Sequence, residues 1–319
     1  MPAERPTDFP ELADSYRREL LAHCYRMLGS VHDAEDLVQE TMLRAWRGFE
    51  QFDGRSSVRT WLYRIATNAC LTALQSRQRR VLPSGLGSAD DDYGALSLER
   101  ADAVPWITPL PTSSDADPAE VATLRDSTRL ALVVALQHLP ARQRAVLLLV
   151  EVVGFDVGEA AAFLGVSYPA ARSLLQRARA TLKIKGPAQD EVPPATAEDG
   201  ELLARYLSAF EAADTAGLAR ILRDDAQYEM PPMRQWFRGP EPIVAHHHAR
   251  VWTRERRAVP VRANGLPAMA SYTRPDGGAF ELHAIHVVEP VGDRIGRIVV
   301  FLDSSLAGPF GLPPVLDAA

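Results

Sequence analysis

Two breaks in the hydrophobic pattern constrain what this 319-residue chain can fold into. Residues 83–117 hold several Gly and Pro residues, many Ser and an acidic run at 90–92, and residues 186–197 read GPAQDEVPPATA. Such stretches are typical of linkers rather than of helices or strands. The length also favours two or three domains over one. We therefore expect three folded segments, at residues 10–82, 118–185 and 198–310.

Composition narrows the class of protein. The chain is 46% hydrophobic and 24% charged, which is typical of a soluble globular protein. No apolar run approaches the roughly 20 residues that span a bilayer, and the start MPAERPTDFPEL does not resemble a secretory signal. Cys24 and Cys70 lack CxxC spacing and lie in apolar periodic stretches, which predicts reduced core residues in a cytoplasmic protein without membrane contact. A net charge of −6 argues against a general nucleic-acid coat, but a local basic surface can still bind DNA.

The first segment predicts an amphipathic helix that begins at about Asp33, which could cap it. Apolar or small residues recur at helical spacing and predict one buried stripe: Ala34, Leu37, Val38, Thr41, Met42, Ala45 and Trp46. The opposite face carries Glu35, Asp36, Gln39, Glu40 and Arg44. From periodicity alone, this polar face is most simply the solvated side of a core helix.

The following stretch, residues 54–89, contains no acidic residue. Its arginines include Arg55, Arg59 and Arg64, and Trp61, Tyr63 and Asn68 are interleaved with them. Arginines that track phosphates, aromatic rings that stack on bases and an amide that reads a base edge are suited to single-stranded DNA. The alternative is that the aromatic rings are core residues and the arginines only keep the surface soluble.

The second segment predicts a helix-turn-helix. Residues 117–120 form a capping box with proline at the first helical position, and further helices are expected at about 118–139 and 140–153. Asp156 and Glu159 open a short helix that stops at Gly165, and Ser167 can cap a longer helix to about Lys183. A short helix, a tight turn and a longer helix match helix-turn-helix spacing.

The last helix of this segment sorts its residues by face. The inward positions are Ala171, Leu174, Leu175, Ala178 and Leu182, and the outward positions are Pro169, Arg172, Ser173, Gln176, Arg177 and Lys183. Residues 160–189 contain no acidic residue. Short polar groups at the start of such a helix can contact base edges in the major groove while arginines hold phosphate or guanine. A basic surface helix in an ordinary bundle is the alternative.

The third segment changes its periodicity along its length. Helical spacing dominates residues 198–250, with a short apolar segment near 226–230, and short apolar strands follow at 259–303. The turns are predicted at Asn264-Gly265 and at 275–278. Acid–base candidates in this segment are His246, His247, His248, His283, His286, Glu229 and Asp303. Adjacent residues on a helix point about 100° apart, so the three consecutive histidines cannot form a metal site by themselves.

Residues 10–184 together resemble an extracytoplasmic-function (ECF) sigma factor. Three stretches carry the resemblance: DAEDLVQET at 33–41, FDGRSSVRTWLYRIATN at 52–68, and LPARQRAVLLL at 139–149 followed by GEAAAFLGVS at 158–167. Three motifs in the family's order are much more specific than one. The resemblance implies a protein that binds core RNA polymerase and directs promoter-specific transcription initiation.

The resemblance also implies roles for individual residues. Asp36, Gln39 and Glu40 would bind the clamp helices of the largest polymerase subunit. The −10 element would be melted and read by Arg55, Ser56, Trp61, Arg64 and Asn68, with Asn68 in the pocket for a flipped base. The −35 element would be read by Ser167, Pro169, Arg172, Ser173, Gln176 and Arg177, in a domain that also binds the flap of the second-largest subunit.

Residues 198–310 resemble a SnoaL-like domain, a cone-shaped α+β fold, so the expected architecture is two all-α sigma domains followed by this domain. Sigma factors with this extension and a Trp-Pro linker motif form subgroups in which the extra domain tunes activity, often without a separate anti-sigma factor. Trp106 and Pro109 match that linker motif loosely, and Glu229, Trp236 and His283 are candidates for a pocket. We expect no catalytic residue, metal or cofactor.

Three alternatives remain from the sequence. A stand-alone helix-turn-helix repressor would not explain the 33–68 stretch. An enzyme with a DNA-binding appendage would show activity in residues 198–310. The same segment could also be a ligand sensor on an enzyme-like fold.

Overall fold

The computed structural model describes residues 13–52, 54–90, 98–112, 128–186, 197–274 and 278–316. It divides into two compact units. The first combines residues 1–80 with 130–187, and the second combines residues 81–129 with 188–319. The expected capping box at 117–120 and the turn at 275–277 lie outside the described residues. Within the described residues, no helix is both long enough and apolar enough to cross a membrane.

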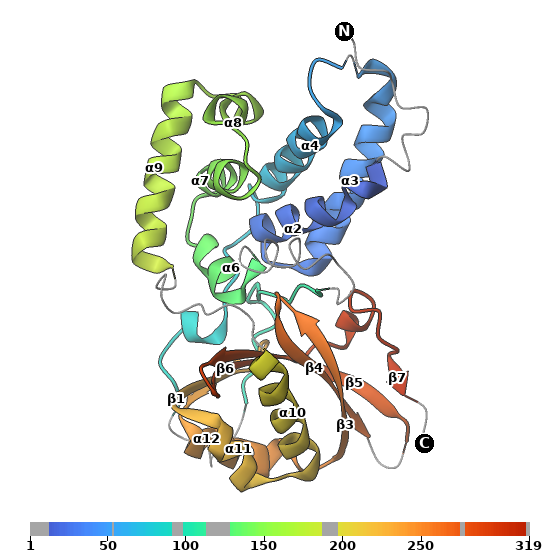
Figure 1. The fold of residues 1–319 in the computed structure, drawn as a ribbon, viewed down its shortest axis with the longest axis vertical. Helices are drawn as coiled ribbons and strands as arrows, with labels where there is room; N and C mark the ends of the chain where they lie inside the picture. The colour runs from blue at the N-terminus through green and yellow to red at the C-terminus, as the bar shows by residue number, and fades with distance from the viewer. Residues whose placement is uncertain are drawn as a thin grey trace. The chain divides into compact units, whose positions relative to one another are not determined.

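The first unit is built from helices (Figure 1). In its first part these are α2 (Arg17–Leu28), α3 (Val31–Gly48), the 3-10 turn η1 (Phe49–Gln51) and α4 (Val58–Ala73). In its second part they are α6 (Leu130–Leu136), α7 (Ala141–Leu147), the π-helical turn η3 (Leu148–Val152), α8 (Val157–Leu164) and α9 (Tyr168–Lys185).

Helix α3 departs from its predicted start and stripe. Its cap is Ser30, whose hydroxyl accepts a hydrogen bond from the Asp33 amide. Asp33, the predicted cap, lies inside the first turn instead, and its carboxylate pairs with Arg77 and Arg80. Four of the seven stripe positions are buried: Ala34, Val38, Thr41 and Ala45. Trp46 is 60% exposed, so the prediction that it lies in the core was wrong. Its position falls at the edge of the stripe of buried residues on α3.

A buried arginine joins the two parts of the first unit. The Arg144 guanidinium donates to the backbone oxygen of Met27, to Gln137 Oε1 at 2.8 Å and to the backbone oxygen of Leu139 at 3.1 Å. Burial lowers its pKa to about 10, which still leaves it charged at neutral pH. A buried charge that binds carbonyls from both parts is costly to leave unpaired, so it ties them into one body.

An aromatic contact adds to this junction. The ring of Tyr63 on α4 meets the ring of Phe155 edge-on at 5.5 Å, and the Arg59 guanidinium lies over both rings. Arg59 also pairs with Glu19 at 3.0 Å. This face of α4 is therefore committed to internal packing.

The second unit holds an antiparallel-rich sheet with helices against it (Figure 1). Its helices are the 3-10 turn η2 (Pro83–Gly85), α10 (Ala197–Ala212), α11 (Thr215–Ile221), α12 (Pro240–His246), the π-helical turn η5 (His247–Val251) and the 3-10 turn η6 (Ser304–Ala307). Its strands are β1 (Leu222–Glu229), β2 (Trp236–Arg238), β3 (Glu255–Ala263), β4 (Leu266–Arg274), β5 (Phe280–Val291), β6 (Arg294–Phe301) and β7 (Val315–Leu316).

The strands run in the order β2-β1-β6-β5-β4-β3, and β7 pairs with β5. Every neighbouring pair is antiparallel except β1 with β6. The predicted Asn264-Gly265 turn joins β3 to β4, and both residues have positive φ (54° and 71°), as this two-residue hairpin turn requires. A core that includes Tyr206, Phe210, Phe237 and Ile298 fills the space between sheet and helices. The expected α+β cone is confirmed.

Candidate nucleic-acid interface

The helix-turn-helix of the first unit forms by local rules. Asp156 and Glu159 make a reciprocal capping box at the start of α8, and Gly165 ends α8 with φ 62°. Ser167 then caps α9 by accepting from the Ala170 amide at 3.4 Å. These three predicted signals are confirmed, and together they present one long face of α9.

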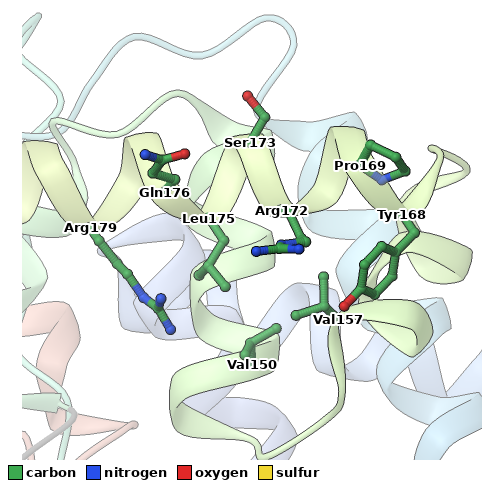
Figure 2. A pocket seen from close by; sticks show the side chains of 9 residues that line it. All are labelled: Val150, Val157, Tyr168, Pro169, Arg172, Ser173, Leu175, Gln176 and Arg179. Carbon is green, nitrogen blue, oxygen red and sulfur yellow. The ribbon is translucent and has the colours of Figure 1, made fainter.

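That face borders a groove of about 660 Å³ (Figure 2). In Figure 2, Ser173 and Pro169 lie on the outer side of α9, whereas Arg172, Leu175 and Tyr168 face Val150 and Val157. The groove therefore pairs an apolar floor with two arginines on its wall, Arg172 and Arg179.

Four of the six residues predicted for the −35 element line this groove: Pro169, Arg172, Ser173 and Gln176. Ser167 and Arg177 are exposed but do not line it. Sequence reasoning missed Tyr168 and Arg179, although both fall on the same helical face as Arg172 and Gln176. The missed signal was the spacing of 168, 172, 176 and 179.

The face predicted to bind polymerase lies on α3. Asp36 and Gln39 are exposed, and the partly buried Glu40 pairs with Arg44 one turn later at 2.6 Å. Both the acidic and the amide side chains therefore point to solvent, as a docking surface requires.

The residues predicted for the −10 element separate into two groups. Arg55, Arg64 and Asn68 are exposed and Ser56 is partly buried, so these side chains are accessible. Trp61 is only 9% exposed and packs on Phe52, with ring centroids 5.0 Å apart, so we correct its expected role as a base-stacking residue. It supports the helix because α4 turns this ring toward η1.

The segment between the two helical parts belongs to the second unit. At its start, the Ser84 amide donates to Glu229 Oε2 at 2.7 Å, and Glu229 is fully buried. The Trp236 indole donates to the Gly87 carbonyl at 3.0 Å, and the Asp90 amide donates back to the Trp236 carbonyl at 2.8 Å. Residues 84–90 are thereby held along β1 and β2.

Asn264 holds the other end of this segment. Its Oδ1 accepts from the Leu110 amide at 3.0 Å, its amide nitrogen donates to the Thr128 carbonyl at 2.7 Å, and its backbone amide donates to the Leu110 carbonyl at 2.8 Å. The adjacent Gly265 amide donates to Thr112 Oγ1 at 2.9 Å. One hairpin turn therefore fixes residues that precede and follow the undescribed stretch 113–127.

Trp106 and Pro109, the predicted linker motif, are both buried. Trp106 is 9% exposed, packs on Val81 and Ala101, and donates from its indole to the Ala101 carbonyl at 3.0 Å. Trp106 therefore folds the linker onto itself beside the C-terminal domain.

Buried charges surround Glu229, the residue that binds the Ser84 amide at the start of the linker. Arg297 Nε donates to Glu229 Oε1 at 2.8 Å, and Arg297 also lies 3.9 Å from Glu289. Burial raises the pKa of Glu289, partly offset by Arg297. Burial alone would lower the pKa of Arg297, but Glu229 and Glu289 raise it. Glu229 is thus a structural carboxylate.

A cavity of about 370 Å³ lies inside the second unit, between the sheet and the α12–β3 region. His283 lines it, but Glu229 and Trp236 do not, so the predicted pocket is corrected at these two residues. Both side chains instead bond to the linker, Glu229 to the Ser84 amide and Trp236 to the Gly87 carbonyl.

Two further histidines line the cavity and are buried, His246 and His286. His286 Nδ1 lies 3.0 Å from the Tyr206 hydroxyl and Nε2 lies 3.1 Å from Ser271 Oγ. Burial, followed by the His247 and Arg250 charges, lowers the pKa of His246 to about 3. The described residues contain no cluster of three or more His, Cys, Asp or Glu that could hold a metal ion.

The comparisons with known proteins agree with this division. Residues 12–80 match the family model for Sigma-70 region 2, and residues 129–182 match the model for Sigma-70 region 4. The ECF RNA polymerase sigma factor SigG of Mycobacterium tuberculosis is 48% identical over 320 residues, covering 98% of this chain and 86% of the relative. SigM of the same species is 31% identical over 174 residues, covering 54% of this chain and 74% of the relative.

One solved structure has a similar fold along nearly the whole chain. The crystal structure of the extracytoplasmic function sigma factor SigJ of Mycobacterium tuberculosis has a TM-score of 0.61 to this chain at 21% identity. The similarity covers 96% of this chain and all of the solved chain. At that identity, the similarity concerns the fold.

Proposed function

Because the chain belongs to the ECF RNA polymerase sigma factors, we propose that its C-terminal domain tunes promoter-specific initiation by holding the linker between the two DNA-binding domains. The observation that carries this proposal is the docking of residues 84–90, 98–112 and 128 within the second unit. The sigma activity itself follows from the family.

The linker contacts set a limit on domain separation. An undocked chain can extend by about 3.3–3.6 Å per residue, so residues 81–129 could span a long distance between the two promoter elements. When Ser84, Leu110 and Thr128 are bound to the C-terminal domain, the linker can no longer extend over that distance. The C-terminal domain therefore restrains transcription initiation by holding the linker, and release of the linker increases transcription.

We assign the surfaces of the first unit as the family implies. Asp36, Gln39 and Glu40 bind the clamp helices, and residues 129–182 contact the flap. Arg55, Ser56, Arg64 and Asn68 contact the −10 element. The groove face of α9 contacts the −35 element, with Arg172 and Gln176 as base or phosphate contacts and Tyr168 added to the set.

The −10 assignment has a direct test. Asn68→Ala removes an exposed amide, so folding should be unaffected, while open-complex formation by the reconstituted holoenzyme should fall by about tenfold or more. Asn68 lies one turn before Thr72, and Thr72→Ala on the same exposed surface serves as the control. Unchanged open-complex formation by Asn68→Ala would reject the base-pocket role.

The restraint has a second test in transcription in vitro. A chain that ends at Lys185 and the full-length Asn264→Gly variant both lose linker anchors, the first entirely and the second at Leu110 and Thr128. Both should transcribe more than the full-length protein, with no anti-sigma factor added. Equal or lower activity of both variants would reject restraint and favour a supporting role.

We infer that the C-terminal domain is not an enzyme, because three of its acid–base candidates are held by protein partners. Glu229 is paired with Arg297, and Asp303 caps the turn at Ser305 by accepting from its amide at 2.9 Å. His286 is held by Tyr206 and Ser271. The cavity favours ligand sensing as a second candidate function. Turnover of a small molecule by the isolated domain would reject the non-enzymatic view.

A further inference from the structure

We propose that the cavity of the C-terminal domain binds a small organic acid with an apolar body, and that the bound acid strengthens linker docking. The coupling to the linker rests on the function proposed above, whereas the binding does not. The cavity volume of about 370 Å³ lies in the range of small-molecule sites, which is about 300–1,000 Å³.

The charges that line the cavity all have one sign. Arg250, Arg254 and Arg256 are cationic, and no aspartate or glutamate is among the described residues that line it. The buried histidines His246 and His286 have pKa values lowered chiefly by burial, so they are neutral at neutral pH and do not add charge. An anionic head group therefore meets only attractive charges here, and a cation would be repelled.

The cavity also offers buried polar atoms that lack a protein partner. His246 is 2% exposed, and its Nδ1 is buried without a hydrogen-bond partner among the described residues. Arg256 Nε is buried in the same condition, although its other nitrogens donate to the Phe210 and Arg254 carbonyls. Unsatisfied buried groups are costly, so a ligand that reaches them gains free energy.

Much of the remaining wall is apolar and suits a hydrocarbon or aromatic body. It is formed by Phe210, Tyr228, Met230, Val300 and Leu302, which come from α10, β1 and β6 and their ends. This combination of an apolar wall and a few convergent polar groups is typical of ligand sites. Arg250, Arg254, Arg256 and the buried His246 all belong to residues 246–256, so the acid group is placed beside this stretch, with the exposed Arg250 and Arg254 at the mouth.

The linker contributes to the same wall. Leu98 of the linker and Met233 line the cavity together. Behind them, Arg100 forms a β-bridge with Met233, the Arg234 amide donates to the Glu99 carbonyl at 3.1 Å, and the Ala101 amide donates to the Pro232 carbonyl at 2.9 Å. An occupant that packs on Leu98 therefore stabilises the docked linker.

The binding test uses the full-length protein with octanoate and benzoate as probes, and octanamide and benzamide as uncharged partners of the same shape. Calorimetry at neutral pH should show one site per chain and at least about tenfold tighter binding of an acid than of its amide. No saturable binding of either acid up to about 1 mM, or equal binding of acid and amide, overturns the proposal.

Two matched variants locate the site. Arg254→Gln at the mouth should weaken acid binding roughly threefold to tenfold, because an exposed charge is partly screened. Arg220→Gln removes the same charge from α11 outside the cavity and should leave the affinity unchanged. Equal effects of the two variants would mean nonspecific charge attraction and would overturn the site.

The coupling is read by limited proteolysis. Trypsin cleavage after Arg100 requires the linker to leave Met233, so saturating octanoate should slow it at least about twofold. Binding with unchanged cleavage overturns the coupling. Trypsin cleavage measures linker docking itself, whereas transcription by the Asn264→Gly variant measures whether the docked linker restrains initiation. A failure of ligand coupling can therefore be told apart from a failure of the proposed restraint.

Discussion

Helix α9 is formed by interactions between residues close in sequence, whereas the linker is positioned by interactions between residues far apart in sequence. The face of α9 that borders the groove is formed by local signals, namely a cap at Ser167, a left-handed glycine at 165 and helical spacing. The described part of the linker, residues 83–90 and 98–112, has little regular structure, and it is held by hydrogen bonds to residues far along the chain, such as Ser84 to Glu229 and Leu110 to Asn264. Changes to the linker anchors should therefore alter stability and regulation, whereas changes to the exposed groove face of α9 should alter DNA binding with little effect on stability.

The largest effect is expected from Glu229→Ala. It leaves the Arg297 guanidinium buried without its closest carboxylate and removes the acceptor of the Ser84 amide. Breaking a buried ion pair costs about 3–5 kcal/mol, or about 6–20 °C in Tm for a unit of this size. Thermal unfolding measures it. The control is Asp225→Ala, which breaks the exposed Arg223 pair and should cost less than about 1 kcal/mol. Similar losses for both variants would contradict a buried anchor.

The Asn264 turn separates backbone strain from linker docking. Asn264→Gly keeps the positive φ but removes both side-chain bonds to the linker, at an expected cost of about 1–2 kcal/mol. Asn264→Ala loses the same bonds and adds strain, for about 2–4 kcal/mol in total. Chemical denaturation of the full-length chain measures both. If Asn264→Gly and Asn264→Ala lowered the free energy of unfolding equally, the positive φ of the turn would not contribute to the cost of the alanine variant.

Acid should destabilise the second unit more than the first. Burial lowers the pKa of His246 to about 3 and of His247 to about 4, and in the first unit it lowers the pKa of His23 to about 3. Each folded pKa lies below the ordinary value of 6.5, so the unfolded chain binds more protons. Stability is therefore full above pH 6.5 and is lost as pH falls below it, by about 1.4 kcal/mol per histidine at pH 5.5.

The measurement follows the unfolding midpoint between pH 7.5 and 5.5, above the range in which ordinary carboxylates titrate. A Trp46→Phe, Trp61→Phe double variant leaves Trp106, Trp236 and Trp252 to report on the second unit. His248→Gln changes an exposed neighbour and should not alter the slope. A midpoint that is flat over this range would contradict the histidine argument.

The same contrast explains what the sequence could predict. The capping box at Asp156, the turn at Asn264-Gly265 and the inward face of α9 depend on residues close in sequence, and each was found. Trp61 and Trp46 were misplaced because burial at the edge of a helical stripe depends on which neighbours cover it.

The role of Glu229 could not be predicted from the sequence. Its partner, the Ser84 amide, lies 145 residues away in the chain, and only the fold brings the two together. The linker at 83–117 stays a prediction, and irregular backbone carries no sequence pattern that identifies the surface it binds. The cavity was expected from the fold family, and only His283 of its three predicted residues lines it.

The smallest change in stability is expected on α9, and it completes the contrast. Gln176→Ala removes an exposed side chain and should change the free energy of unfolding by less than about 0.5 kcal/mol. Ser167→Ala removes the cap and should cost about 0.5–1 kcal/mol, since its hydrogen bond is long at 3.4 Å. In a promoter-binding assay the order should reverse, because Gln176 faces the groove and its loss should weaken binding up to about tenfold, whereas Ser167 acts through helix order. If both variants weakened binding in proportion to their loss of stability, the groove face of α9 would be a structural surface and not a reading surface.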